Sequence, residues 1–288
     1  MRIKVPASSA NLGPGFDSMG MALGLYLTID VLEPTDHWVV DHDLEQIPHD
    51  ERNMVVRAAL KVKADLAPHH IVVNSPIPLA HGLGSSSSCN VGGIELANQI
   101  AKLHLSAEEK VEIASQIEGH PDNVAPTILG GTVIGTSLHD HFIAVKAPAM
   151  PYQFVAYVPA YNLKTSDSRN ALPNMIGFHE ATQASAIANT LAAALFAQDY
   201  QAVGELMEAD MFHEPYRSKL VPELAQVRAI AHQHQALATY LSGAGPTVMT
   251  LLPEDASVDE FVQALKANGL VDPVMVLPIA EAGVEVEN

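Results

Sequence analysis

The chain has 288 residues, of which 48% are hydrophobic and 17% are charged, a composition that indicates a folded protein with a sizeable core and excludes intrinsic disorder. Its 15 basic and 33 acidic residues give a formal net charge of −18. Such an acidic protein lacks the basic surface that binds nucleic acids or anionic membranes, so neither partner is expected. Cys89 is the single cysteine, which excludes an internal disulfide and a cysteine-based zinc site.

The predicted elements alternate between strands and helices along the whole chain. Runs rich in β-branched, aromatic and apolar residues indicate strands, and apolar residues three or four positions apart indicate helices. In chain order we expect strands at residues 24–32 and 71–73, helices at 91–105 and 106–117, strands at 132–136 and 153–158, helices at 180–197, from 201 and from 222, a strand at 247–252, a helix at 257–267 and a last strand at 274–277.

Both halves of the chain mix strands with helices, which predicts an α+β fold. Two prolines and a polar turn interrupt the pattern near residues 147–152. We therefore expect two domains, residues 1–150 and 151–288. The chain has no apolar stretch of the length that a signal peptide or a membrane span needs, so we expect a soluble, cytoplasmic protein.

The strongest local signal is a loop rich in glycine and serine at residues 78–88, just before the helix expected at 91–105. Glycines let a backbone approach a ligand closely, and the free N–H groups at a helix N-terminus attract an anion such as phosphate. The loop lacks the lysine of a Walker motif. From these physical arguments alone, an ordinary turn with a capping serine explains the segment equally well.

Three further segments combine small, polar and glycine residues: residues 6–17, 118–123 and 242–247. The first offers the polar groups of Asn11 and Asp17 to a pocket, and the second follows a helix that carries Glu112. Carboxylates near a phosphate loop suit magnesium, which prefers oxygen ligands. Taken singly, each segment is explained as well by a surface turn, and Glu112 by a solvated position on its helix.

In this order the segments resemble the three motifs of the GHMP small-molecule kinases. PASSANLGPGFD at residues 6–17, EGHPDNVAP from residue 118 and SGAGPT from residue 242 look most like the homoserine kinases of that family. The resemblance extends from residue 6 to residue 278. Two more segments, LKTSDSRNALP at residues 163–173 and HEPYR at residues 213–217, resemble stretches that bring a threonine and two arginines to the acceptor site of those enzymes.

The resemblance implies the two-domain GHMP kinase fold, with a ribosomal S5 domain 2-like N-terminal part and a ferredoxin-like C-terminal part. It implies that ATP, with Mg²⁺, phosphorylates the side-chain hydroxyl of L-homoserine to give O-phospho-L-homoserine for threonine biosynthesis. The resemblance leaves open whether two copies of the chain form a homodimer. Two alternatives also remain: a related kinase acting on another small alcohol, such as mevalonate or shikimate, and a metabolite-binding regulator without catalytic activity.

The same resemblance assigns residues to the amino-acid acceptor. Homoserine carries a carboxylate, which a planar arginine fork binds well, and an ammonium, which a carboxylate binds. Arg169 and Arg217 would therefore hold the carboxylate of the acceptor, Asp17 would hold its ammonium, and Asn11 would orient it.

The resemblance also assigns residues to the nucleotide, the metal and catalysis. Ser86 and Glu112 would hold magnesium, with Glu118 as the reserve. No general base stands out, so the acceptor hydroxyl would attack directly while Asn123 and Thr165 orient it. The implied ATP-binding residues are Asn53, Pro78, Leu79, Ala80, His81, Gly82, Leu83, Gly84, Ser85, Ser86, Ser87 and Ser88.

Overall fold

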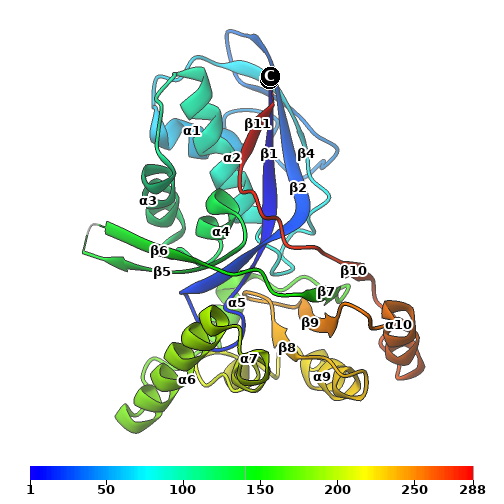
Figure 1. Ribbon diagram of the computed structural model, residues 1–288. Coiled ribbons are helices and arrows are strands. Elements are labelled where there is room, and N and C mark those ends of the chain that lie inside the picture. Colours follow the sequence, from blue (N-terminus) through cyan, green and yellow to red (C-terminus); the bar gives the residue numbers. More distant parts are fainter. Residues whose placement is uncertain (140, 288) are drawn as a thin grey trace.

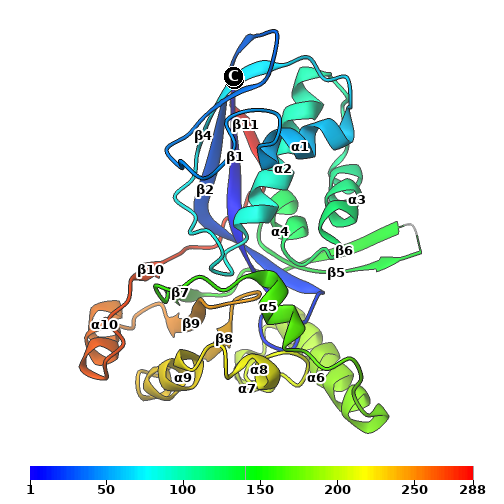
Figure 2. The ribbon, with the colours of Figure 1, turned by 180° about the vertical axis from the view of Figure 1, so that it is seen from behind.

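Two β-sheets organise the computed structural model, which describes residues 1–139 and 141–287 (Figures 1 and 2). The first sheet has the order β11-β1-β2-β4-β3, with β5 paired to β2 and β6 paired to β5. Its strands are β1 (Arg2–Ala10), β2 (Met19–Pro34), β3 (Val39–Asp41), β4 (His69–Asn74), β5 (Thr132–Leu138), β6 (His141–Ala147) and β11 (Glu285–Glu287). Four helices lie beside this sheet: α1 (Met54–Val62), α2 (Ser85–Ile100), α3 (Ala107–Glu118) and α4 (Val124–Leu129).

The second sheet has the order β10-β7-β9-β8, and all three of its strand pairs are antiparallel. Its strands are β7 (Tyr152–Tyr157), β8 (Ala238–Leu241), β9 (Val248–Pro253) and β10 (Val274–Val276). Its helices are α5 (Thr165–Asn170), α6 (Phe178–Ala197), α7 (Tyr200–Met207), α8 (Glu214–Arg217), α9 (Glu223–Gln233) and α10 (Val258–Ala267). Helices connect β7 to β8 and β9 to β10, so this half has a ferredoxin-like arrangement. Both halves contain strands and helices, and the predicted α+β class is confirmed.

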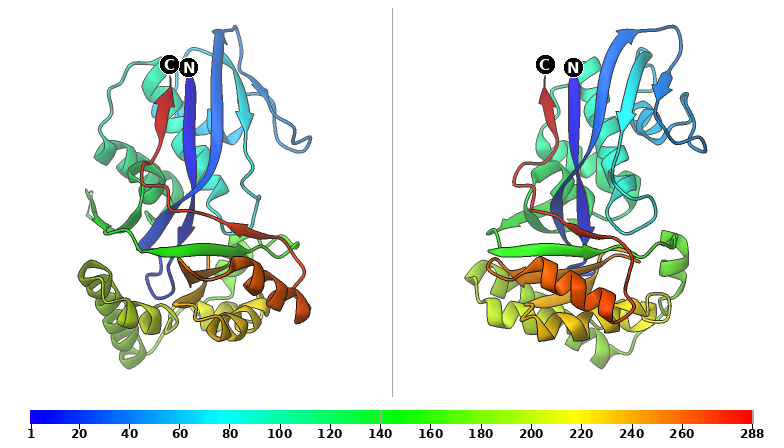
Figure 3. Two further views of the ribbon diagram at one scale, coloured as in Figure 1. Left: turned by 45° about the vertical axis from the view of Figure 1, so that its right-hand side comes forward. Right: turned by 90° about the vertical axis from the view of Figure 1, so that its right-hand side faces the viewer.

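The C-terminal segment returns from the second sheet to the first. Strand β11 pairs antiparallel with β1, and the N–H of Gly24 donates to the carbonyl of Pro278 at 2.7 Å. The two chain ends therefore lie side by side (Figure 3). The main hydrophobic core also contains side chains from both sheets, among them Ile29 and Met249. The two halves therefore share one hydrophobic core, and the C-terminal strand of the chain belongs to the sheet of the first half.

Several local predictions are confirmed, and the differences have physical causes. Ser106 forms the capping box of α3 with Glu109, as its spacing predicts. The segment at residues 6–17, interpreted as a loop, begins inside β1, because its small residues are buried on both faces of the strand and give no alternating pattern. The strand at 274–277 is not the last, since β11 follows it. No helix in the described part of the chain is long and apolar enough to span a membrane.

Candidate active site

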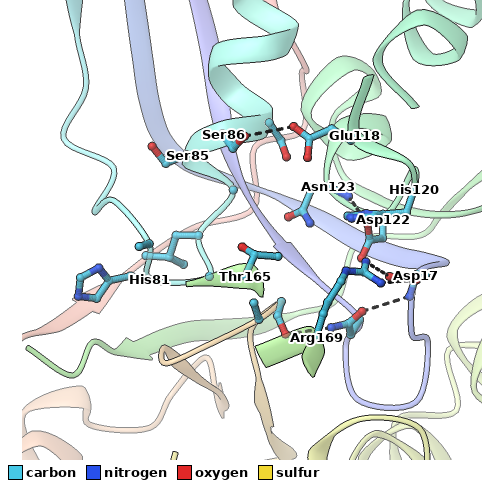
Figure 4. A pocket seen from close by; sticks show the side chains of 18 of the residues that line it. Asp17, His81, Ser85, Ser86, Glu118, His120, Asp122, Asn123, Thr165 and Arg169 are labelled. Atoms are coloured by element: carbon cyan, nitrogen blue, oxygen red, sulfur yellow. Dashed lines mark hydrogen bonds and ion pairs between the residues drawn. The ribbon is translucent and has the colours of Figure 1, made fainter. Parts of the chain in front are cut away.

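A cavity opens where the ends of β1, α2, α3 and α5 meet (Figure 4). One wall is the glycine- and serine-rich loop, and the opposite wall carries charged side chains from both halves of the chain. The structure thus brings together segments that are more than 150 residues apart in sequence. The site residues assigned from the sequence that line it, besides the loop, are Asn11, Asp17, Asn123, Thr165, Arg169 and Arg217.

Glycines fix the path of the loop. Gly82 and Gly84 have φ angles of 76° and 69°, in the left-handed region that favours glycine. A Cβ atom at Gly84 would collide with the Ser8 hydroxyl, and one at Gly82 would collide with the carbonyl of Ser242. The Ser242 hydroxyl also donates to the Gly82 carbonyl at 2.7 Å. The second glycine loop, at residues 242–247, therefore holds the first in place.

The N-terminus of α2 opens into this cavity and has the features that favour an anion. Helix α2 begins at Ser85, directly after Gly84, and no side chain caps it. Its first turn contains no acidic residue, and Ser85, Ser86 and Ser87 line the cavity. Unsatisfied N–H groups and the positive end of the helix dipole favour a bound phosphate there. The anion site expected from the loop sequence therefore has the right local geometry.

A second, more apolar pocket adjoins this helix end and shares Ala80, Ser85 and Ser86 with the cavity. Asn53 lines it and caps α1, because its Oδ1 accepts from the Val55 N–H at 3.0 Å. Such a pocket beside a phosphate site suits a nucleoside. Every residue of the loop from 78 to 87 borders one of the two spaces.

Ser88 is the exception among the loop residues assigned to ATP. Its side chain is fully buried and donates to the carbonyls of Pro6 at 2.9 Å and Gly84 at 3.1 Å. These bonds direct the hydroxyl into the protein, because Ser88 already lies within the first turn of α2. Ser88 therefore supports the loop from behind and borders neither pocket. The structure thus corrects this part of the sequence-based assignment.

The carboxylate next to Ser86 belongs to Glu118 and not to Glu112. The Ser86 hydroxyl lies 3.4 Å from Glu118 Oε1 (Figure 4). Asn90 donates a hydrogen bond to the same oxygen. Glu112 accepts a hydrogen bond from Gln116 at 3.0 Å and lines no part of the cavity. The reason is position, since Glu118 is the last residue of α3, at the end that faces the cavity. A hydroxyl and a carboxylate there are suitable oxygen ligands for magnesium.

Asp17 and Arg169 form an ion pair on the opposite wall. The guanidinium nitrogens lie 2.8 and 3.2 Å from the two carboxylate oxygens, and the side chains are 35% and 39% exposed (Figure 4). Asn11 supports the Asp17 loop, because its Oδ1 accepts from the Asp17 N–H at 3.2 Å and its Nδ2 donates to Gly243 at 3.1 Å. Asn11 thus lines the cavity with its amide engaged in the protein.

Arg217 lies deeper in the same wall and is only 2% exposed. Burial, with a further contribution from the charge of Arg169, lowers the pKa of Arg217 to about 10, so it still carries its charge at neutral pH. The guanidinium groups of Arg169 and Arg217 lie 5.6 and 5.4 Å from the centre of the Phe16 ring. The wall therefore carries two guanidinium groups beside the carboxylate of Asp17.

Asn123 and Thr165 lie between the charged wall and the loop (Figure 4). Asn123 Oδ1 accepts from the Ser8 hydroxyl at 2.9 Å, which leaves the amide NH₂ as the group available to a ligand. His120 and Asp122, two residues of the segment at 118–123 to which the sequence resemblance assigns no role, also line the cavity and are hydrogen-bonded to each other. Their ligand atoms and that of Asp17 lie within 4.8 Å of one another.

Comparison with known proteins gives consistent matches over the full chain. The family model for the GHMP kinases N terminal domain matches residues 53–131, and that for the GHMP kinases C terminal matches residues 191–270. A homoserine kinase of Limosilactobacillus fermentum is 60% identical over 286 residues, which cover 99% of this chain and 100% of that protein.

Solved structures agree in fold. A candidate homoserine kinase from Listeria monocytogenes superposes with a TM-score of 0.89 at 45% identity, covering 100% of this chain and 99% of the other. The homoserine kinase of Cytophaga hutchinsonii gives a TM-score of 0.86 at 28% identity, covering 100% of this chain and 97% of the other. The two-domain fold implied by the sequence motifs is therefore confirmed.

Proposed function

The chain belongs to the GHMP kinase family, and from that premise we infer that it is a homoserine kinase. It transfers the γ-phosphoryl group of ATP to the side-chain hydroxyl of L-homoserine and gives O-phospho-L-homoserine for threonine biosynthesis. Homoserine kinases from three lactobacilli that are 53% to 60% identical over the full chain support this function. Dependence on Mg²⁺ and a cytoplasmic location are further parts of the proposal.

One observation carries the proposal for the acceptor: a carboxylate and two guanidinium groups share the wall opposite the N-terminus of α2. A zwitterionic amino acid matches this wall, with its ammonium on Asp17 and its carboxylate on Arg169 and Arg217. Its side-chain hydroxyl then points toward the phosphate loop. Mevalonate and shikimate carry a carboxylate but no ammonium, so Asp17 would have no partner on them.

The reaction needs positioning and charge neutralisation more than proton chemistry. We propose that the hydroxyl oxygen of homoserine attacks the γ-phosphorus in line with the departing ADP, while its proton passes to the transferred phosphoryl oxygens or to solvent. The Asn123 amide and the Thr165 hydroxyl, which line the space between donor and acceptor, orient that oxygen. Magnesium, which Ser86 and Glu118 would hold, neutralises the charge of the triphosphate when bound.

A panel of acceptors tests this function directly. Release of ADP is measured with L-homoserine, mevalonate and shikimate at saturating ATP and magnesium. We expect turnover with homoserine and little with the other two. Preference for mevalonate or shikimate would overturn the assignment of homoserine as the substrate but not the kinase activity. No ADP release with any acceptor would favour a metabolite-binding regulator without catalytic activity.

His120 should give homoserine binding a measurable pH dependence. Burial opposes its charged form, but the hydrogen bond to Asp122 and the nearby carboxylates outweigh burial, so the pKa of His120 is raised above 6.5. An imidazolium beside Asp17 competes with the ammonium of the substrate. The KM for homoserine should therefore rise as pH falls through this raised pKa.

The His120→Gln variant provides the comparison, because glutamine keeps polarity without a titratable group. Its KM for homoserine, measured across the same pH range, should change less than that of the wild type. The KM for ATP should follow the same pH profile in both proteins. Identical homoserine profiles for wild type and variant would show that His120 does not titrate next to the acceptor.

A further inference from the structure

His213 is a fully buried histidine that contacts Arg217 of the proposed acceptor site and Gly13 in the loop between β1 and β2. Its Nε2 lies 2.9 Å from the carbonyl oxygen of Gly13. A carbonyl oxygen only accepts hydrogen bonds, so Nε2 carries the proton and Nδ1 has a free lone pair. Arg217 Nη1 lies 3.2 Å from that Nδ1 and donates to it. Neutral His213 thus accepts from Arg217 on one side and donates to Gly13 on the other.

This contact completes the set of bonds that orient the Arg217 guanidinium. Nε donates to the carbonyl of Ser168 at 3.3 Å, and Nη1 donates to the carbonyl of Gly243 at 3.0 Å. With His213, both hydrogens of Nη1 are used. Among residues 1–139 and 141–287, Nη2 has no protein acceptor, so it is the nitrogen left for a ligand.

Packing holds the two side chains in this relation. The ring of Phe16 stacks on the His213 ring, with centroids 5.4 Å apart and planes inclined by 26°, and the Arg217 guanidinium lies 5.4 Å from the Phe16 ring centre. Burial lowers the pKa of His213, which keeps Nδ1 unprotonated. A protonated ring would instead turn an N–H toward the guanidinium and lose the hydrogen bond.

We infer that His213 is a positioning residue for the acceptor: its Nδ1 lone pair sets the orientation in which Arg217 binds the carboxylate of the amino acid. The inference rests on the proposed function, and it extends the acceptor site to a residue that touches no substrate. Arg217 then binds the carboxylate through its free Nη2 edge. Loss of the Nδ1 acceptor would leave one buried Nη1 hydrogen without a partner and hold the guanidinium by two bonds instead of three, which would weaken that binding.

Two substitutions separate positioning from simple structural support. Asparagine places its Oδ1 where His213 Nδ1 lies, so His213→Asn keeps the acceptor for Arg217 and loses the donor to Gly13. Glutamine places its amide nitrogen where Nε2 lies, so His213→Gln keeps the Gly13 bond and loses the Arg217 acceptor. A merely structural histidine would give similar effects in both variants.

The measurement is the KM for L-homoserine and for ATP in both variants, with thermal melting as the check on folding. We expect His213→Gln to raise the homoserine KM about tenfold, the lower end of what a hydrogen bond to a charged group contributes. His213→Asn should recover most of that loss. The ATP KM should stay close to the wild-type value in both.

Equal homoserine KM values in the two variants, or a defect that falls on ATP, would overturn the inference. If the glutamine variant does not fold, a tenfold rise in the folded asparagine variant would overturn it as well, since that variant keeps the Arg217 acceptor. A wild-type protein that does not phosphorylate homoserine would overturn the proposed function instead, so the two failures are distinguishable.

Discussion

Glu118→Gln should lower turnover with homoserine by about a hundredfold or more, a loss of the size found when one preorganised group that stabilises transition-state charge is removed. Glutamine keeps the size of the side chain and can still bond to Asn90, so the fold should survive. The carboxylate beside Ser86 is lost, and with it the proposed oxygen ligand of magnesium. The measurement is kcat over a range of magnesium concentrations, where the variant should also need more metal for half-maximal activity.

Glu112→Gln is the matched control on the same helix. Glu112 lies outside the cavity and bonds to Gln116, so its substitution should leave turnover and magnesium dependence near the wild-type values. A strong loss in Glu112→Gln with little effect in Glu118→Gln would restore the ligand expected from the sequence. It would also mean that α3 is placed differently when nucleotide is bound.

The choice between these two glutamates shows what the sequence could and could not determine. The pattern predicted α3 and its capping box, because both depend on residues within a few positions of one another. Which carboxylate meets Ser86 depends on how α3 packs against α2, and no local pattern records that. The C-terminal end of α3, which carries Glu118, faces the phosphate loop, whereas the polar face of α3, which carries Glu112, does not.

The acceptor wall illustrates the same limit at longer range. Motif resemblance selected Asp17 and Arg169, but their ion pair joins positions 152 apart and follows from the meeting of the two sheets. The sequence also gave no role to two polar side chains that prove to be buried at the site. His213 and Asp122 stand inside quoted motifs, yet their burial and bonding become visible only once the neighbouring backbone is in place.

Asp17→Asn should reduce kcat/KM for homoserine about ten- to a hundredfold. A charge-assisted hydrogen bond contributes about 1.5–3 kcal/mol, and about 1.4 kcal/mol corresponds to a factor of ten. Asparagine keeps the shape of the side chain but offers no negative charge to the ammonium. The same substitution releases Arg169 from its ion pair, so binding of the acceptor's carboxylate should not suffer.

The comparison that decides the role of Asp17 uses 4-hydroxybutyrate, which has the hydroxyl and carboxylate of homoserine and no ammonium. Asp17→Asn should affect this acceptor little or improve it, because no cation is left unpaired and Arg169 is free. Asp167→Asn, which removes an exposed carboxylate from the helix that carries Arg169, should change neither acceptor. General structural damage from the Asp17 substitution would instead depress both acceptors equally. If the wild type uses 4-hydroxybutyrate as well as homoserine, the ammonium contact does not exist and the substrate assignment fails, while the kinase activity remains.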